Sequence, residues 1–510
     1  MPPEYKRIGL FDHMGWGNMG DAAVQEAFII NITRRVPDAT LIGFSLYPED
    51  TRKRHNIVSY PIRWWYPGWE ATHKPMANVP DRTSRRKELR TKFPTFYAFA
   101  KRIYDCGREL AHLIRSYKVV RSLDVLLFSG GGQLCELHGD LPYNVFKFCV
   151  LAKLANTPVC IVGVGADLLQ RPLNKFFAKW SVRLADYTSF RSNESKALVQ
   201  SLGVKTKTHV CPDPAYALDV KSYITSDPAN RLTGSESAAL LGNLGIETKT
   251  LVWPVPLYSC DHNTDRNVRL SNIPSPKVGL NPMGFCDPRR WPRKDVASYH
   301  QYLAKLTAFS KWILAHNYRL EIFTSDVIVD VFAIEDLKER LLAVASSDER
   351  CNLAFRPVLT LRELFLQMST FDFVITSKFH GIIFSHLLKK PVIALSYLPK
   401  IDHLMRAVGH DRYCLNIEHS DEKQLIAMFR LLVREKDWLK AMFGKTSETY
   451  AAALRTHFDS LFGSVATPIG LGEAGTGLTR ATEMGSGELL GARGGVQAVG
   501  VGRSIHSGGM

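Results

Sequence analysis

Short apolar segments that end in glycine-rich turns recur along the first half of the chain. Each has the length of a buried strand, and helical spacing follows the first turn. The order strand, turn, helix is typical of α/β proteins with a mainly parallel sheet. Because parallel strands end at one edge of a sheet, the turns are expected to converge on one ligand. The segments cover residues 7–13, 123–129 and 157–162, and their turns cover residues 15–21, 130–133 and 163–167.

Several residues in these turns are suited to line a binding site. Glycine allows close backbone approach to a ligand, which makes Gly131 and Gly132 candidates. Asn18, Asp21 and Asp167 are polar candidates at the same sheet edge, although Asp21 would equally serve as a helix cap. The glycine spacing matches neither the dinucleotide-binding fingerprint nor the phosphate-binding loop of nucleotide hydrolases.

The second half of the chain repeats the pattern with charged residues in the turn. Residues 371–375 are predicted to form a buried strand and residues 382–388 a helix, with Thr376-Ser377-Lys378-Phe379-His380-Gly381 as the turn between them. A helix start favours an anion, so Lys378 would add charge for binding a phosphate. His380 can transfer protons near neutral pH. The alternative is a solvated lysine and a histidine that only packs.

Arg191 lies between a strand-like run and the helix expected over residues 193–202. Its planar guanidinium would hold a phosphate or carboxylate through two hydrogen bonds. The alternative is an ion pair with Glu194 or Asp186. Asp213 ends a further strand and is either a polar site residue or a turn former.

Composition limits the classes of partner. The net charge of +16 favours an anionic partner, but no nucleic-acid-binding signature accompanies it. The nine cysteines include no CxxC pair, and His, Asp and Glu do not cluster at ligand spacing, so neither a metal nor another cofactor is expected. The N-terminus lacks an apolar leader, and no run reaches the roughly 18 apolar residues of a membrane span. We therefore expect a cytoplasmic protein, at most peripheral to the inner face of the membrane.

Changes in pattern along the chain suggest its division into domains. Aromatic and basic residues at about 55–95 indicate an insertion that could stack on sugars, contact a membrane interface or simply pack. The last residues are too poor in large apolar side chains to order themselves. The expected parts are an N-terminal Rossmann-like domain (1–225), a linker or insertion (226–276), a C-terminal Rossmann-like domain (277–400), a helical segment (401–465) and a disordered glycine-rich tail (466–510).

Taken together, these motifs resemble the polysaccharide pyruvyl transferase family, in the family's order and over about residues 8–410. Each motif is weak by itself, and the set is specific. The matching motifs are Gly17-Asn18-Met19-Gly20-Asp21, Ser129-Gly130-Gly131-Gly132-Gln133-Leu134, Gly163-Val164-Gly165-Ala166, Arg191-Ser192-Asn193-Glu194-Ser195, Leu202-Gly203-Val204, Pro212-Asp213-Pro214-Ala215, Ser377-Lys378-Phe379-His380-Gly381 and Pro391-Val392-Ile393-Ala394-Leu395-Ser396-Tyr397.

The resemblance implies two Rossmann-like domains that face each other in a GT-B-like arrangement. It also implies phosphoenolpyruvate as donor, without a cofactor, and a sugar, oligosaccharide or lipid-linked saccharide as acceptor. The product would be a pyruvate ketal on a surface or exported polysaccharide. The other readings are a GT-B glycosyltransferase that uses a nucleotide sugar, and a non-catalytic carbohydrate-binding protein on the same fold.

The resemblance also assigns roles to residues. An arginine of the family matches Arg191, and its Arg-x-His-Gly pattern matches Lys378 and His380. Lysine neutralises a phosphate as a point charge but does not hold it through two parallel hydrogen bonds. We expect Arg191 and Lys378 to position phosphoenolpyruvate and His380 to donate a proton. Asp21, Asp167 or Asp213 would accept the hydroxyl proton, and the sequence does not rank them.

Overall fold

A computed structural model describes residues 5–12, 17–64, 92–136, 141–225, 275–356 and 358–462. Most of the predicted 55–95 insertion, nearly all of the 226–276 linker and the whole of the 466–510 tail lie outside these residues. Within them, no helix is long and apolar enough to cross a membrane.

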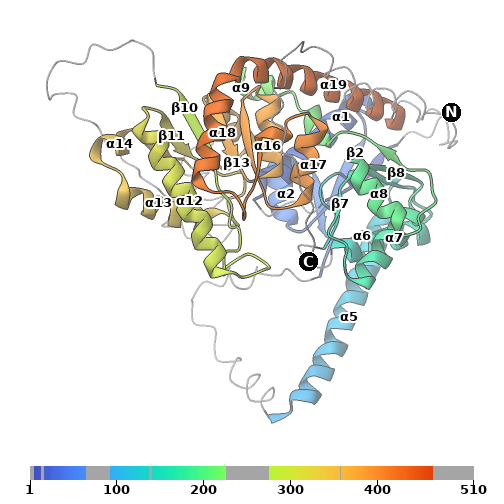
Figure 1. The fold of residues 1–510 in the computed structure, drawn as a ribbon. Coiled ribbons are helices and arrows are strands. Elements are labelled where there is room, and N and C mark those ends of the chain that lie inside the picture. Colours follow the sequence, from blue (N-terminus) through green and yellow to red (C-terminus); the bar gives the residue numbers. More distant parts are fainter. Residues whose placement is uncertain are drawn as a thin grey trace, which may run out of the picture.

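The first domain is built on a parallel sheet of seven strands, in the order β3-β2-β1-β4-β6-β8-β9 (Figure 1). Two further short strands of this domain, β5 and β7, form a separate two-stranded parallel sheet. The strands are β1 (Arg7–Phe11), β2 (Thr40–Ser45), β3 (Val58–Pro61), β4 (Val125–Ser129), β5 (Leu134–Cys135), β6 (Val159–Val164), β7 (Ala166–Asp167), β8 (Tyr187–Phe190) and β9 (His209–Val210).

Helices connect these strands, as expected for parallel neighbours, which cannot be joined by tight hairpins. They are α1 (Met19–Arg35), α2 (Pro48–His55), α5 (Pro94–Val120), α6 (Leu141–Leu154), α7 (Pro172–Leu184), α8 (Asn193–Ser201), the 3-10 turn η1 (Pro214–Ala217) and α9 (Val220–Thr225).

The second domain has a parallel sheet of six strands, in the order β12-β11-β10-β13-β14-β15. Its strands are β10 (Lys277–Asn281), β11 (Arg319–Ile322), β12 (Leu353–Phe355), β13 (Phe373–Thr376), β14 (Val392–Ser396) and β15 (Cys414–Asn416). Its helices are α12 (Val296–Ala315), α13 (Val331–Val344), α14 (Ser347–Cys351), α15 (Leu361–Ser369), α16 (Phe379–Leu387), α17 (Pro399–Ala407), η3 (Asp411–Tyr413), α18 (Glu422–Arg434) and α19 (Lys436–Phe462).

Each sheet reverses its strand order at one point, and ligands of open α/β sheets bind beyond the strand ends at such points. In the first sheet the reversal lies between β1 and β4, and in the second between β10 and β13. The segments that follow these strands contain most of the predicted site residues. The fold therefore places two ligand-binding edges in one protein, one from each domain.

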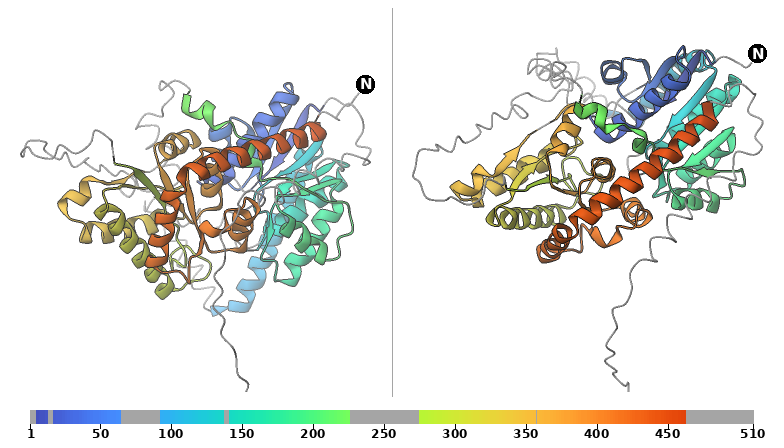
Figure 2. Two further views of the ribbon diagram at one scale, coloured as in Figure 1. Left: turned by 45° about the horizontal axis from the view of Figure 1, so that its top comes forward. Right: turned by 90° about the horizontal axis from the view of Figure 1, so that it is seen from above.

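The long helix α19 runs from the second domain back across the first (Figure 2). Arg35 of α1 forms a salt bridge with Asp459 near its end, and the rings of Phe28 and Phe458 meet edge to face at 5.3 Å. His457 approaches the Ser189 hydroxyl of β8 at 3.2 Å. This crossing helix joins the two domains on the side of α1.

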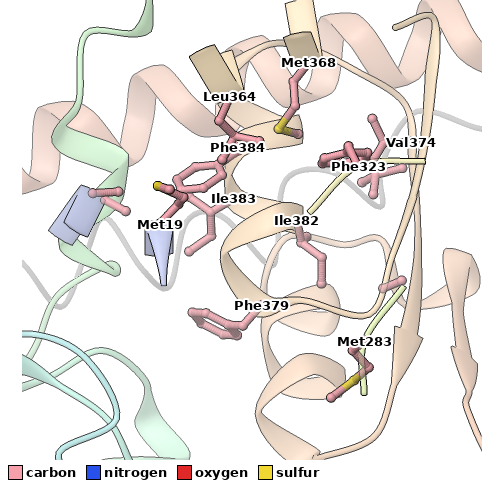
Figure 3. Packing of buried hydrophobic residues seen from close by; sticks show 14 of the residues in the cluster. Met19, Met283, Phe323, Leu364, Met368, Val374, Phe379, Ile382, Ile383 and Phe384 are labelled. Carbon is pink, nitrogen blue, oxygen red and sulfur yellow. The ribbon is translucent and has the colours of Figure 1, made fainter. Parts of the chain in front are cut away.

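Apolar residues of α16 also hold the domains together. Figure 3 shows Met19 of α1 lying against Ile383 and Phe384 of this helix, and all three are fully buried. Phe379 of the same helix lies below these residues in the view and is also buried. The packing positions the first turn of α16 directly opposite the first turn of α1.

Three local expectations from the sequence are wrong in detail. The helix expected after the turn at residues 15–21 begins at Met19, so Gly20 and Asp21 belong to its first turn. The helix after β13 begins at Phe379, so His380 and Gly381 belong to its first turn and not to a loop. Gly163 lies within β6 and not after it, at a register irregularity against β8 and with a φ of 64°. A positive φ favours glycine, which explains why this strand tolerates the residue.

Candidate active site

Backbone contacts between the domains bring their strand ends together. The Met19 amide donates to the Ser325 carbonyl at 2.8 Å, and the Val327 amide donates to the Gly17 carbonyl at 3.2 Å. Asn18 and Asp326 form the isolated bridge between these two hydrogen bonds. Asn18 also caps α1, because its side chain accepts from the Gly20 amide at 2.8 Å. The first helix of the first domain thus begins against a loop of the second.

His380 lies where the first turns of α1 and α16 meet. Its ring packs so closely on Gly20 that a Cβ placed there would lie 2.0 Å from Nδ1. Nε2 is buried, forms no hydrogen bond with the described residues and lies 3.8 Å from the Asp213 carboxylate. Burial, with added repulsion from Arg191, Lys400 and Lys378, lowers the pKa of His380 to about 4 despite Asp213. The imidazole is therefore neutral at pH 7.

Arg191 follows β8 and is held by Asp213. Its guanidinium donates to the carboxylate at 3.1 Å, and only 7% of its side chain is exposed. It also stacks on the Phe379 ring, with 4.3 Å from Cζ to the ring centroid. Gly165 leaves the space that the guanidinium fills, since a Cβ there would lie 2.5 Å from Nε. Such packing fixes the orientation of a planar group that can bind an anion.

Lys378 is bound by two carboxylates of the β11–α13 segment. Its ammonium lies 2.7 Å from Asp330 and 3.4 Å from Asp326. Burial opposes its charge, but these two aspartates outweigh the effect and raise the pKa of Lys378. Burial raises the pKa of Asp330 to about 7 even though Lys378 opposes the rise. The charge of Lys378 is thus largely balanced within its own domain.

Asp21 and Lys400 complete the cluster. Burial and the neighbouring Asp326 raise the pKa of Asp21 to about 7, although Lys400 and Arg191 act in the opposite direction. Lys400, in the first turn of α17, lies over the rings of Phe379 and Tyr397 at 5.9 and 5.8 Å. It forms no salt bridge with any described residue, so its charge is available to an anion.

The structure brings together most of the residues singled out from sequence. Arg191, His380, Lys378, Asp213 and Asp21 form one electrostatic cluster with Asn18 at its side. The candidate glycines lie at the same edge: a Cβ at Gly132 would be 4.0 Å from the Arg191 guanidinium, and one at Gly131 would be 3.3 Å from Asp12.

Asp167 differs from the other candidates. It lies in β7, where it pairs with Cys135, and its Oδ2 is buried without a hydrogen-bond partner among the described residues. The ion pair of Arg191 with Glu194 or Asp186, which the sequence left open, does not form, because Arg191 pairs with Asp213. Asp186 binds Lys153 at 2.6 Å, and Glu194 is exposed in the first turn of α8.

Three charged residues of the cluster were not predicted: Asp326, Asp330 and Lys400. Asp326 follows the apolar segment of β11 by four residues, and Lys400 follows β14 by four residues. Their place after a buried strand is the same signal that indicated Arg191 and Lys378. Within the described residues, no three His, Cys, Asp or Glu side chains are grouped to hold a metal ion.

These features define a class of protein. Two Rossmann-like domains face each other with their strand ends meeting at a buried cluster of cations, carboxylates and one histidine, which is the GT-B arrangement. The chain matches the polysaccharide pyruvyl transferase family over residues 18–399, and it belongs to that family. It is therefore a transferase of polysaccharide biosynthesis. No curated protein matches the chain in sequence.

Solved structures share the fold at low sequence identity. A protein described as a UDP-N-acetylglucosamine 2-epimerase of Listeria monocytogenes is 11% identical, with a TM-score of 0.50 over 89% of this chain and 97% of that one. The UDP-GlcNAc 2-epimerase of Neisseria meningitidis, bound to UDP-GlcNAc, is 11% identical, with a TM-score of 0.48 over 88% and 99%. Anabaena HepE, in complex with UDP, is 11% identical, with a TM-score of 0.47 over 90% and 98%.

Proposed function

We propose that the protein transfers the enolpyruvyl group of phosphoenolpyruvate to a sugar diol and forms a pyruvate ketal. The carrying observation is the buried His380 Nε2, which no described residue hydrogen-bonds and which lies 3.8 Å from the Asp213 carboxylate, with cations of both domains nearby. A group placed in this way can exchange a proton with a substrate. We further propose a cytoplasmic site of action, on a saccharide destined for the cell surface or for export.

Arg191 and Lys400 would bind the donor's phosphate and carboxylate, with Lys378 as a further cation. Arg191 is oriented by Asp213 and Phe379, so little of its freedom remains to be lost on binding. Lys400 has no carboxylate partner among the described residues. Lys378 reaches the donor only in competition with Asp330 and Asp326, and protonation of Asp330 near pH 7 would weaken that competition.

Asp21 is the best of the three aspartates to accept the hydroxyl proton. Asp213 is already used on both oxygens, by the Arg191 guanidinium and the Ala215 amide. The carboxylate of Asp167 forms no ion pair with a described residue of the cluster. Asp21 has a pKa of about 7, which allows it to bind and release a proton near neutral pH.

The chemistry would proceed by addition and elimination. One sugar hydroxyl adds to C2 of phosphoenolpyruvate while Asp21 takes its proton and His380 protonates the methylene carbon, C3. The C2–O bond to phosphate then breaks with its electron pair on the leaving phosphate. The second hydroxyl forms the other C2–O bond, and its proton departs with the phosphate. Bound phosphate, as a nearby anion, would raise the pKa of His380 and favour its protonated form.

Thermal shift in low salt tests the proposed donor. We expect phosphoenolpyruvate to raise the melting temperature, because a ligand that binds only the folded state stabilises it. The rise should exceed that with inorganic phosphate and should be lost in Arg191→Ala. Lys153→Ala is a matched control, because it removes a cation outside the cluster that pairs with Asp186. Stabilisation by UDP alone would support a nucleotide-sugar glycosyltransferase and contradict the proposal.

The pH dependence of kcat/KM tests the roles of Asp21 and His380. The mechanism needs one proton shared between Asp21 and His380. The pKa is about 4 for His380 and about 7 for Asp21, so the pair carries one proton between pH 4 and pH 7. Above pH 7 that proton is lost, so kcat/KM should fall about tenfold per pH unit. The break should vanish in Asp21→Asn. A constant or rising kcat/KM from pH 7 to 9 would refute this assignment.

A further inference from the structure

The helix α5 extends away from the body of the first domain (Figure 1). It has 27 residues, and its buried residues all lie in the last nine: His112, Ser116 and Val120. Glu109 anchors the same end, accepting from Lys147 at 3.0 Å. The first four turns therefore present most of their side chains outward.

An apolar stripe runs along this exposed part of α5. Its members recur at alternating steps of three and four residues, which is the heptad pattern of a coiled-coil seam. Four of them are between 58% and 67% exposed, although they are large and apolar. The stripe consists of Phe96, Phe99, Ile103, Cys106 and Leu110, and the pattern continues through Leu113 and Tyr117.

The stripe is narrow, and charge lies behind it. At about 100° per residue, its members fall within roughly 80° of the helix circumference. Lys101, Arg108 and Arg115 recur every seven residues on the opposite face. A helix that faces a core or lies in a lipid surface has a broader apolar face, whereas a strict 3-4 seam is typical of helix pairs. The pattern thus favours another helix as the partner.

We propose that a second copy of this chain covers the stripe, so that two α5 helices pair in a homodimer. Phenylalanine buries about 150–250 Å². Because only 58–67% of each large stripe residue is still exposed, two phenylalanines with the isoleucine, leucine and cysteine would bury on the order of 450 Å² per helix. The stripe would thus supply about half of the roughly 800 Å² per partner of a stable interface. The pairing would be independent of the proposed donor and acceptor.

The charges beside the stripe favour an antiparallel pair. Arg102 and Glu109 lie on the same flank, seven residues apart. In antiparallel helices with Ile103 of one chain opposite Cys106 of the other, the Arg102 of each faces the Glu109 of its partner. There Oε2 of Glu109 could accept from Arg102, since Oε1 already accepts from Lys147 of its own chain. Parallel helices would place like residues at the same level. Gly107, where nothing lies within 4 Å of an added Cβ, leaves room for close approach on the other flank.

Sedimentation velocity of the full chain at micromolar concentration tests the dimer with two neighbouring substitutions. Ile103 and Tyr104 are 58% and 60% exposed, but only Ile103 belongs to the stripe. We expect wild type and Tyr104→Glu to sediment as a particle of twice 57.4 kDa, and Ile103→Glu as one of 57.4 kDa. Wild type that sediments as a monomer, or two variants with the same behaviour, would overturn the proposal.

Cross-linking gives a second readout at the centre of the stripe. Cys106 is the one exposed free cysteine among the described residues. A short bismaleimide should join two chains in wild type, but not in Cys106→Ser or in Ile103→Glu. Monomeric protein that floats with anionic phospholipid vesicles and loses this binding in Ile103→Glu would assign the stripe to a membrane surface instead, and would refute the dimer.

Discussion

Replacing His380 by alanine is expected to lower turnover by about 10²–10⁴-fold, the usual contribution of a general acid or base. The imidazole lies between Gly20, Asp213 and the Arg191 guanidinium, and its Nε2 has no hydrogen-bond partner in the described part of the chain. Without this group no other side chain at that position can protonate C3. Phosphate release from phosphoenolpyruvate in the presence of acceptor measures the loss.

A second buried histidine provides the control for folding. Burial lowers the pKa of His112 to about 4, as it does for His380, but His112 lies in α5 near Ser116. His112→Gln should keep near-normal turnover even where it lowers the melting temperature. His380→Ala should melt close to wild type and show the loss of turnover of about 10²–10⁴-fold. A folded His380→Ala protein with near-normal turnover would remove the histidine from the mechanism.

The strands and most helices were predictable because their signals are local. The apolar run 123–129 contains β4, and the helical segment predicted over 401–465 contains α18, where Asp421 and Gln424 form a capping box. The start of α16 was missed because Lys378 makes no side-chain cap hydrogen bond there. The helix is instead fixed by tertiary packing of Ile383 and Phe384 on the first domain.

The residues of the candidate site were likewise predictable where their signal is local, and their interaction partners were not. Position after a strand indicated Arg191, Lys378 and His380 without any knowledge of their partners. The partners could not be predicted, because Asp213 lies 22 residues from Arg191 and Asp326 lies 52 residues from Lys378. Each of these pairs forms within one domain, so only the tertiary fold of that domain decides which carboxylate neutralises which cation.

The contact between Gly20 of the first domain and His380 of the second underlies the second large effect. Gly20→Ala is expected to lower turnover by about 10²-fold or more, because a displacement near 1 Å of a catalytic group has an effect of this size. The added Cβ would lie 2.0 Å from Nδ1, 2.5 Å from Cγ and 2.8 Å from Cβ of His380. These are atoms of a packed ring and its stem, so the ring must move or the domains must separate.

Turnover and small-angle scattering measure the two ways in which Gly20→Ala can relieve the clash. A displaced ring lowers turnover at an unchanged radius of gyration, whereas separated domains increase the radius as well. Gly444→Ala in α19 is the matched control, since its Cβ would meet only the flexible end of Lys389 at 3.0 Å. It should leave both quantities unchanged. Full activity of Gly20→Ala would mean that the contact between Gly20 and His380 is not kept during catalysis.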